Sequence, residues 1–416
     1  MSEWLVDTVR GRVFCSKIRV SRDVLTEATV RLAFRSVIAA VFFAGASVAR
    51  AGPFEDGQVA YQRHDYATAL RLWRPLADQG DANAENKLGN MYAHGLGVLQ
   101  DYAEALKWYH KAADLGLPNA EANLGDTSAL GRGVPQDYAE AVKWYRKAAD
   151  QGNAYAQFSL GVASASGHGV PQDYDEAVKW YSKAANQGNG AAQSSLGFMY
   201  SNGQGVPQDY AEAAKWFRKA ADQGNAYGQH NLGVMYRDAE GVPQDYVEAA
   251  KWFRKAADQG LVGAQLNLGT MYTLGQGVPQ DYAEAAKWNR LAADQGFAEA
   301  QASLGVAYIQ GQGVPQDYAE AVKWCRKAAD QGIARAQGAL GLMYEQGWGV
   351  AQDYVLAYTW LNLSASREYV AEGRDILTKL RDEVAAMMTP SQIAEAQRMA
   401  REWKPTAADG SPAAKP

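Results

Sequence analysis

The hexapeptide GVPQDY and two one-letter variants of it occur eight times in this 416-residue chain, and successive copies begin 36 residues apart. A fixed period of this length is typical of solenoids, in which each repeat is one supersecondary unit that buries its apolar face against its neighbours. The pattern constrains the fold strongly, because every copy has to adopt the same local structure. The copies begin at Gly97, Gly133, Gly169, Gly205, Gly241, Gly277, Gly313 and Gly349.

The residues ahead of each hexapeptide predict a first helix, which we call helix A. In NAYGQHNLGVMY, residues 225–236, Leu232 and Tyr236 lie four positions apart and therefore on one helix face. Gly233 stands between them, and a glycine recurs at this position in all eight repeats. A glycine inside a helix costs about 1 kcal/mol relative to alanine. We therefore expect a neighbouring helix backbone to approach so closely that a Cβ would not fit.

A G-x-G-V turn follows helix A. Glycines just past a helix end adopt the left-handed conformation that satisfies its last carbonyl groups. A phosphate-binding loop would need a preceding strand and G-x-G-x-x-G spacing, and the sequence has neither. We interpret the turn as a helix cap. One repeat departs from the pattern, with Ala239 in place of the first glycine.

The end of the hexapeptide predicts the start of a second helix, helix B. Asp137 stands three residues before Glu140, the spacing of a capping box. An apolar stripe of period 3.6 follows, and a tryptophan recurs on it in every repeat, from Trp108 to Trp360. The hexapeptide is therefore predicted to separate two helices and not to be a reactive motif.

Together, LG-x-MY, the G-x-G-V turn and D-Y-x-x-A-x-x-W-[YF]-x-K-A-A-x-x-G resemble the Sel1-like repeat family, relatives of tetratricopeptide repeats. The resemblance implies an all-α fold, a right-handed α-solenoid of helix-turn-helix repeats. A secreted branch of the family staples each repeat with a disulfide, but this chain has only Cys15 and Cys325. Its stability has to come from packing, and Cys325, at a position that is aromatic in other repeats, is predicted to be a buried filler.

The N-terminus resembles a secretory signal peptide. The 14-residue apolar run at residues 36–49 precedes the small residues of Ala49-Arg50-Ala51, and it is shorter than the roughly 20 residues of a membrane-spanning helix. The 35 residues before the run are too many for a usual leader, so the translation start stays open. We expect a bacterial protein that is periplasmic or secreted, with no stable membrane span after cleavage.

The repeat register predicts the domain organisation. Residues 1–51 form the signal peptide, 52–80 a degenerate half-repeat and 81–368 eight 36-residue repeats. Residues 369–404 resemble the helical cap that closes bacterial members of the family, and residues 405–416 have the composition of a disordered tail.

Charge and motif content argue against several functions. The net charge of −5 does not suit a general nucleic-acid binder. The five histidines show no metal-ligand spacing, and the serine-enzyme motifs S-x-x-K, K-T-G and G-x-S-x-G are missing. We therefore predict no enzyme, no cofactor and no metal. The alternative is a cell-wall-active or β-lactam-recognising hydrolase, a label that some relatives carry.

Comparison among the repeats separates fixed positions, which serve stacking, from variable ones. The variable positions of helix A form one stripe, which is aromatic and apolar in the middle repeats, as expected of interface anchors. Because solenoid curvature normally places helix A on the concave surface, we predict that a protein or peptide binds in a concave groove there. The predicted groove residues are Tyr155, Phe158, Phe198, Tyr227, His230, Arg237, Leu266 and Leu274.

Two other interpretations of the stripe stay open. Its side chains could fill gaps between neighbouring A helices, or the protein could be a passive spacer, for which a uniformly polar stripe is expected. Repeats two and three also lose the usual Met-Tyr pair, to Thr127-Ser128 and Ala163-Ser164, which leaves volume for Phe158 or a partner side chain to fill. Our prediction is a monomeric interaction scaffold of the cell envelope, with the regulatory role that the resemblance implies.

Overall fold

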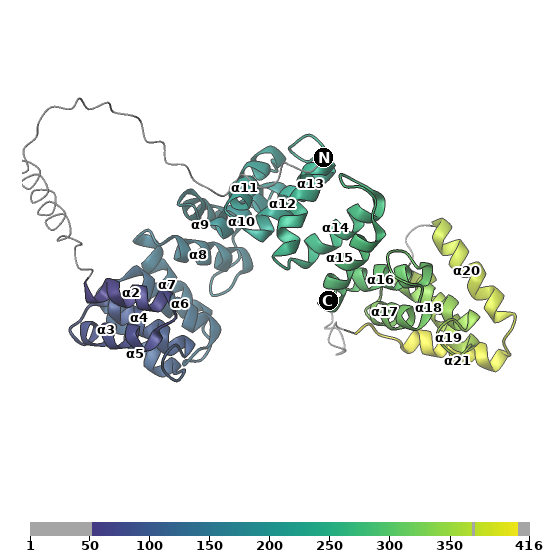
Figure 1. Cartoon of the computed structure of the whole chain (residues 1–416), viewed down its shortest axis with the longest axis horizontal. Coiled ribbons are helices and arrows are strands. Elements are labelled where there is room, and N and C mark those ends of the chain that lie inside the picture. The colour runs from purple at the N-terminus through teal and green to yellow at the C-terminus, as the bar shows by residue number, and fades with distance from the viewer. Residues whose placement is uncertain (1–51, 368–370, 407–416) are drawn as a thin grey trace, which may run out of the picture. The chain divides into compact units, whose positions relative to one another are not determined.

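The computed structural model describes residues 52–367 and 371–406 (Figure 1). Its regular elements in these ranges are twenty α-helices, α2 to α21. The predicted all-α repeat solenoid is therefore confirmed, while its right-handed sense stays a prediction. The predicted signal peptide and residues 407–416 of the predicted tail lie outside the described residues. Within the described ranges, no helix has the length and apolar content needed to cross a bilayer.

The chain divides into two compact units, Met1–Leu76 and Ala77–Pro416. The described part of the first unit contains α2 (Pro53–Gln62) and most of α3 (Tyr66–Asp78). Trp73 is fully buried in this unit. Its indole N–H donates to the carbonyl oxygen of Phe54 at 3.1 Å, and its ring lies 5.6 Å from that of Tyr61. One aromatic cluster thus holds these two helices together.

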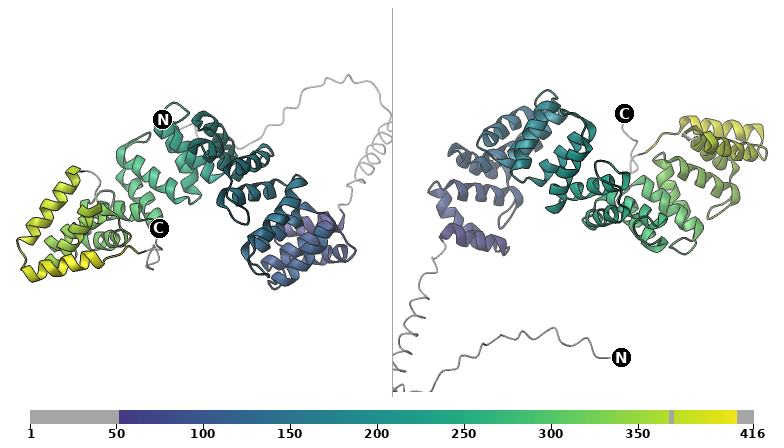
Figure 2. Two further views of the ribbon diagram at one scale, coloured as in Figure 1. Left: turned by 180° about the vertical axis from the view of Figure 1, so that it is seen from behind. Right: turned by 90° about the horizontal axis from the view of Figure 1, so that it is seen from above.

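In the second unit the chain alternates between helix A and helix B, and consecutive helices from α4 to α20 pack against one another (Figures 1 and 2). The A helices are α4 (Ala82–His94), α6 (Pro118–Leu130), α8 (Ala154–Ser166), α10 (Gly190–Asn202), α12 (Ala226–Asp238), α14 (Val262–Leu274), α16 (Ala298–Gln310) and α18 (Ala334–Gln346). The B helices are α5 (Tyr102–Asp114), α7 (Tyr138–Asp150), α9 (Tyr174–Asn186), α11 (Tyr210–Asp222), α13 (Tyr246–Asp258), α15 (Tyr282–Asp294), α17 (Tyr318–Asp330) and α19 (Tyr354–Arg367).

The aspartate of the hexapeptide is the N-cap of helix B, as predicted. Asp137 Oδ1 accepts the backbone N–H of Glu140 at 2.9 Å. The reciprocal half of the predicted capping box is not formed, because the Asp137 N–H donates instead to the Ser128 carbonyl of helix A at 2.8 Å. The Glu140 carboxylate pairs with Lys143 at 2.9 Å. One aspartate therefore joins the end of helix A to the start of helix B.

Other letters of the hexapeptide also make specific contacts. The Gln136 side chain donates to the Ala129 carbonyl near the end of helix A and to the Tyr138 hydroxyl, both at 2.8 Å. The glycine lies against the preceding repeat, since a Cβ on Gly169 would stand 2.3 Å from the Tyr138 carbonyl oxygen. The motif therefore caps helix B, bonds to the end of helix A and contacts the preceding repeat. This confirms the prediction that it separates two helices.

The first glycine of the turn has the predicted left-handed conformation, as at Gly275 with φ 67°. Ala239 adopts the same conformation with φ 60°, which strains a residue that has a Cβ.

Ala239→Gly is expected to stabilise the protein by about 1 kcal/mol, because it relieves the strain of left-handed backbone on a residue with a Cβ. Urea unfolding followed by circular dichroism measures the change. Ala394→Gly, at an exposed site inside α21 (Pro390–Glu402), should instead lose about 1 kcal/mol. Destabilisation by Ala239→Gly would show that the strain is relieved in some other way.

The recurring glycine inside helix A has a different cause from the one predicted. A Cβ on Gly233 would lie 2.8 Å from the ring of Phe253 in helix B of the same repeat, and one on Gly125 would lie 2.4 Å from the Tyr145 ring. The expectation of a neighbouring backbone is therefore wrong for these repeats. The aromatic side chain that follows the conserved tryptophan lies against the glycine and leaves no room for a methyl group.

The conserved tryptophans join successive repeats. Trp252 is 6% exposed, with Lys255 Nζ 3.9 Å from its ring centre and the Arg218 guanidinium of the preceding repeat 5.8 Å away. Arg218 also donates a hydrogen bond to the hydroxyl of Tyr236. This arginine–tyrosine–tryptophan arrangement recurs at the three following junctions, which begin at Arg254, Arg290 and Arg326.

A buried glutamine in the first turn of helix A recurs and joins its repeat to the preceding one. The Gln157 side chain donates to the Ala149 carbonyl at 3.1 Å and accepts from Gln187 at 2.7 Å. In the second repeat Glu121 replaces this glutamine; it accepts from Gln151 at 2.7 Å but, when ionised, has no proton to donate. Burial raises the pKa of Glu121, against the opposing effects of Lys147 and Gln151.

Glu121→Gln is expected to stabilise the protein at pH 7 by about 1 kcal/mol, the net worth of one recovered hydrogen bond. Because the folded state raises the pKa of Glu121, acid protonates this carboxyl preferentially in the folded protein. The advantage of the variant should therefore shrink between pH 7 and pH 5, as unfolding in urea at both values would show. The reverse change, Gln157→Glu, should destabilise the third repeat. Equal stability of the wild type and Glu121→Gln at pH 7 would contradict this account.

Two further helices, α20 (Ala371–Ala385) and α21 (Pro390–Glu402), follow the last repeat and pack on α19. The Trp403 ring lies 6.4 Å from that of Trp360. Thr406, inside the segment predicted to be disordered, donates its backbone N–H to the Asp330 carbonyl at 2.8 Å. Cys325 is fully buried as predicted, and burial raises its thiol pKa to about 12.

Candidate partner-binding surface

Three of the predicted groove residues line one cleft of about 580 Å³, which we call the aromatic cleft. Phe158 of α8, Phe198 of α10 and Tyr227 of α12 come from three successive A helices. Phe198 is 51% exposed and Tyr227 64% exposed. Apolar rings this open to water around a concavity are available for contact with another molecule.

The aromatic cleft exists because small side chains stand between large ones. Helix α10 has Ala191 where α8 has Tyr155 and α12 has Tyr227. One turn further along, Ser194 stands where α8 has Phe158, and both Ala191 and Ser194 line the cleft. A repeat with small residues between two repeats with aromatic ones therefore opens a hollow whose walls are rings.

The loss of the Met-Tyr pair in repeats two and three leaves a second, smaller hollow of about 180 Å³. Its walls include Ala163, from one of the altered pairs, together with Phe158 and Tyr145. At its edge the rings of Tyr138 and His168 stack with their centres 4.7 Å apart. Phe158 thus borders the vacated volume without filling it.

Tyr155 lines a different hollow from the other aromatic residues of the stripe. It is 47% exposed, and its hydroxyl donates to Asp126 Oδ1 of the preceding repeat at 2.9 Å. Burial, followed by the charge of Asp126, raises the pKa of Tyr155 to about 12. Burial also raises the pKa of Asp126, which accepts a second hydrogen bond from Tyr145 at 2.7 Å. Tyr155 therefore helps to join two repeats.

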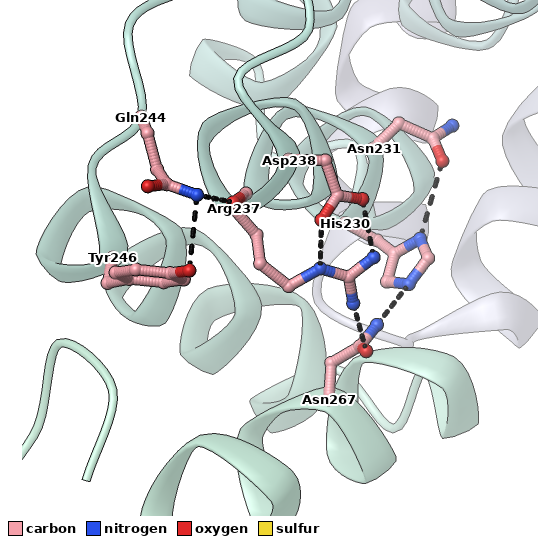
Figure 3. A network of polar contacts seen from close by, with 7 residues as sticks. All are labelled: His230, Asn231, Arg237, Asp238, Gln244, Tyr246 and Asn267. Atoms are coloured by element: carbon pink, nitrogen blue, oxygen red, sulfur yellow. Dashed lines mark hydrogen bonds and ion pairs between the residues drawn. The ribbon is translucent and has the colours of Figure 1, made fainter. Parts of the chain in front are cut away.

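His230 and Arg237 belong to a polar network at the junction of α12 and α14 (Figure 3). Asn267 of α14 donates to His230 Nε2 at 3.1 Å and accepts from Arg237 at 2.7 Å. Arg237 also forms two 2.7 Å bonds with Asp238. Burial lowers the pKa of His230, which suits a neutral ring whose Nε2 accepts a hydrogen bond. Both side chains are held between repeats, and neither lines the aromatic cleft.

The two predicted leucines differ in their surroundings. Leu266 is half-buried and packs on a core cluster that contains Leu304 and Trp324, which matches the gap-filling alternative. Leu274 is 58% exposed and borders a cleft of about 260 Å³ together with Thr270 and Arg335.

The sequence-based prediction missed the polar part of the same stripe. In the first two repeats three of the variable positions hold the asparagines Asn86, Asn90 and Asn119, and these line a separate cleft of about 430 Å³. Asn119 stands where later repeats have Tyr155 and Tyr227, and Asn86 where they have Phe158 and His230. Reading the variable positions in the outer repeats as well as the middle ones would have found Asn86, Asn90 and Asn119, but not that they border one hollow with Asn123 and Asn153.

The described residues contain no group of three or more histidine, cysteine or acidic side chains that could hold a metal ion. Their titratable groups with shifted pKa values are accounted for by caps, pairs and burial at repeat junctions, as at Glu121 and Asp126.

The Sel1 repeat family model matches nine consecutive segments between residues 49 and 369, from 49–81, 82–117 and 118–153 through to 334–369. The chain belongs to the Sel1 repeat family. The first match lies over the segment predicted to be a degenerate half-repeat. Sel1 repeat proteins typically mediate protein–protein interactions, and the family is generally non-catalytic.

Solved structures agree with this Sel1 assignment. A protective antigen present in uropathogenic Escherichia coli strains is 34% identical, with a TM-score of 0.53, over 84% of this chain and 91% of that one. A Sel1 repeat protein from Oxalobacter formigenes is 33% identical, with a TM-score of 0.54, over 58% of this chain and 97% of the other. A search of curated proteins found no match.

Proposed function

We propose that this Sel1 repeat protein is a non-enzymatic scaffold of the bacterial cell envelope that binds a protein or peptide along its A helices. The observation that carries the proposal is the aromatic cleft, where Phe198 and Tyr227 remain largely exposed on successive repeats. Exposed aromatic side chains around a concavity are the usual anchors of protein interfaces. A passive spacer would have no reason to keep them in water.

The envelope location and the regulatory role are part of the same proposal. Two observations support the location: the signal-peptide pattern at residues 1–51 and a 34% identical relative that is named as a protective antigen. A regulatory adaptor suits a repeat surface that offers exposed aromatic contacts. We further propose that the partner contacts lie on the concave side of the solenoid and that the protein acts as a monomer.

The proposal is tested by replacing the two most exposed rings of the cleft. The double variant Phe198→Ala/Tyr227→Ala should fold normally, because both side chains are more than half exposed. It should bind the partner at least about 30-fold more weakly, as expected when an anchor worth about 2 kcal/mol is lost. Affinity capture from an envelope extract, quantified by mass spectrometry for wild type and variant, identifies the proteins whose capture depends on the cleft.

A matched control separates loss of the cleft from loss of exposed apolar surface in general. Val247→Ala/Leu291→Ala removes side chains that are 50% and 43% exposed on the B helices α13 and α15. This control should capture the same proteins as the wild type. Retention of every partner by Phe198→Ala/Tyr227→Ala would rule out the aromatic cleft as the binding site.

A further inference from the structure

The polar hollow beside the aromatic cleft has an unusual lining. Five asparagines from α4, α6 and the start of α8 border its volume of about 430 Å³, and we call it the asparagine cleft. Tyr155 closes one side. The five asparagines are Asn86, Asn90, Asn119, Asn123 and Asn153.

Hydrogen bonds among these amides hold their positions. Asn123 Nδ2 donates to Asn86 Oδ1 at 2.8 Å and to Asn90 Oδ1 at 3.3 Å. Asn153, which caps α8 through its Oδ1, donates from Nδ2 to Asn119 Oδ1 at 2.8 Å. Residues from three repeats are thereby held in two hydrogen-bonded groups, one of Asn86, Asn90 and Asn123 and one of Asn119 and Asn153, and this preorganisation lowers the entropy cost of binding.

The same set leaves hydrogen-bonding groups unused. Asn86 is 7% exposed and borders the hollow. Among the described residues it takes part in one side-chain hydrogen bond, as the acceptor from Asn123, so its Nδ2 makes no bond there. A carboxamide donor that borders a hollow and makes no bond within the protein is suited to an acceptor that enters the hollow. The Asn123 Oδ1 likewise accepts no hydrogen bond from the described residues, which places an acceptor in the same hollow.

The hydrogen-bonding groups of these asparagines and their spacing are complementary to those of a peptide backbone. A carboxamide can donate and accept at once, as a peptide bond does. Asn86 and Asn90 are four residues apart on α4, as are Asn119 and Asn123 on α6, which is a rise of about 6 Å along each helix. Alternate residues of an extended chain are about 6.6 Å apart. Successive amides on one helix are therefore close to the spacing of backbone groups that face the same way in an extended peptide.

The asparagine cleft and the aromatic cleft meet on α8. Tyr155 borders the first and Phe158, three residues later, borders the second. A chain lying along the A helices would pass from one to the other. We propose that the partner is bound as an extended peptide, whose side chains occupy the aromatic cleft while the asparagine cleft binds its backbone. This inference rests on the proposed function and specifies its partner class.

The test uses a 12-residue peptide selected by phage display on the purified protein. Its dissociation constant is measured by fluorescence anisotropy for the wild type and for Asn119→Ala/Asn123→Ala, which removes amides from the cleft. The expected result is about tenfold weaker binding, the loss of about two hydrogen bonds. Asn83→Ala, which removes an exposed asparagine of α4 that does not line the cleft, should bind as the wild type does.

A second measurement leaves the protein unchanged. Methylating the peptide's backbone nitrogens one at a time removes single donors, and alternate positions away from the aromatic anchors should weaken binding about threefold each, as for loss of one such hydrogen bond. If neither the double variant nor any methylated peptide weakens binding, while Phe198→Ala/Tyr227→Ala does, the backbone inference is wrong and the proposed function stands.

Two further outcomes would overturn the inference. If no peptide is enriched, or if enriched peptides bind Phe198→Ala/Tyr227→Ala as tightly as the wild type, both proposals are wrong. An oligosaccharide such as chitotetraose that binds the wild type and loses about tenfold in affinity to Asn119→Ala/Asn123→Ala would assign the asparagine cleft to glycans and overturn the peptide inference.

Discussion

Gly277→Ala is expected to lower the free energy of unfolding by about 3 kcal/mol or more. Gly277 has φ 69° in the turn between α14 and α15, and a Cβ there would stand 2.0 Å from the backbone carbonyl oxygen of Tyr246. Tyr246 begins α13 in the preceding repeat. Because the obstacle is backbone at a junction between repeats, relief would require two repeats to move apart.

Gly275→Ala in the same turn is the matched control. Gly275 has nearly the same backbone conformation, φ 67°, but a Cβ would meet nothing nearer than the Gln280 side chain at 3.3 Å. Its replacement should cost only about 1 kcal/mol, the strain of a left-handed residue. Urea unfolding followed by circular dichroism and tryptophan fluorescence compares the two. Equal losses would mean that contact with the neighbouring repeat contributes nothing at this glycine.

Phe253→Ala is expected to cost about 3–5 kcal/mol, since large-to-small changes of buried aromatic residues leave a cavity. The Phe253 side chain is fully buried and lies on Gly233, whose added Cβ would be 2.8 Å from the ring. Thermal and urea unfolding should both show the loss.

The coupling of Phe253 to Gly233 is measured by a double-mutant cycle. In the wild type, Gly233→Ala forces the ring to move and should cost about 1–3 kcal/mol. In the Phe253→Ala background the methyl group has space, and alanine's better helix propensity should make the same change stabilising by up to about 1 kcal/mol. Additive effects of the two changes would mean that the ring is not the reason for the glycine.

The candidate site was predictable only in part. The exposure of Phe198 and Tyr227 was predictable, because both occupy variable positions of helix A. The fixed positions of a solenoid repeat serve stacking, so the variable ones are those free to contact a partner. Sequence comparison could not tell that His230 and Arg237 are both bonded to Asn267 of the next repeat. The same comparison could not reveal the asparagine cleft, which needs five amides from three repeats to border one hollow.

The sequence by itself determined the helix pairs, their ends and their all-α class, because periodicity and capping depend on residues within a few positions of one another. Only the tertiary structure decided what lies on each glycine, which side chains fill gaps and where hollows remain. Those features arise between residues 20 to 37 positions apart, as in Gly233 with Phe253 and Asn86 with Asn123. These contacts and hollows depend on how side chains of different sizes pack between neighbouring repeats. The sequence pattern within one repeat does not specify that packing.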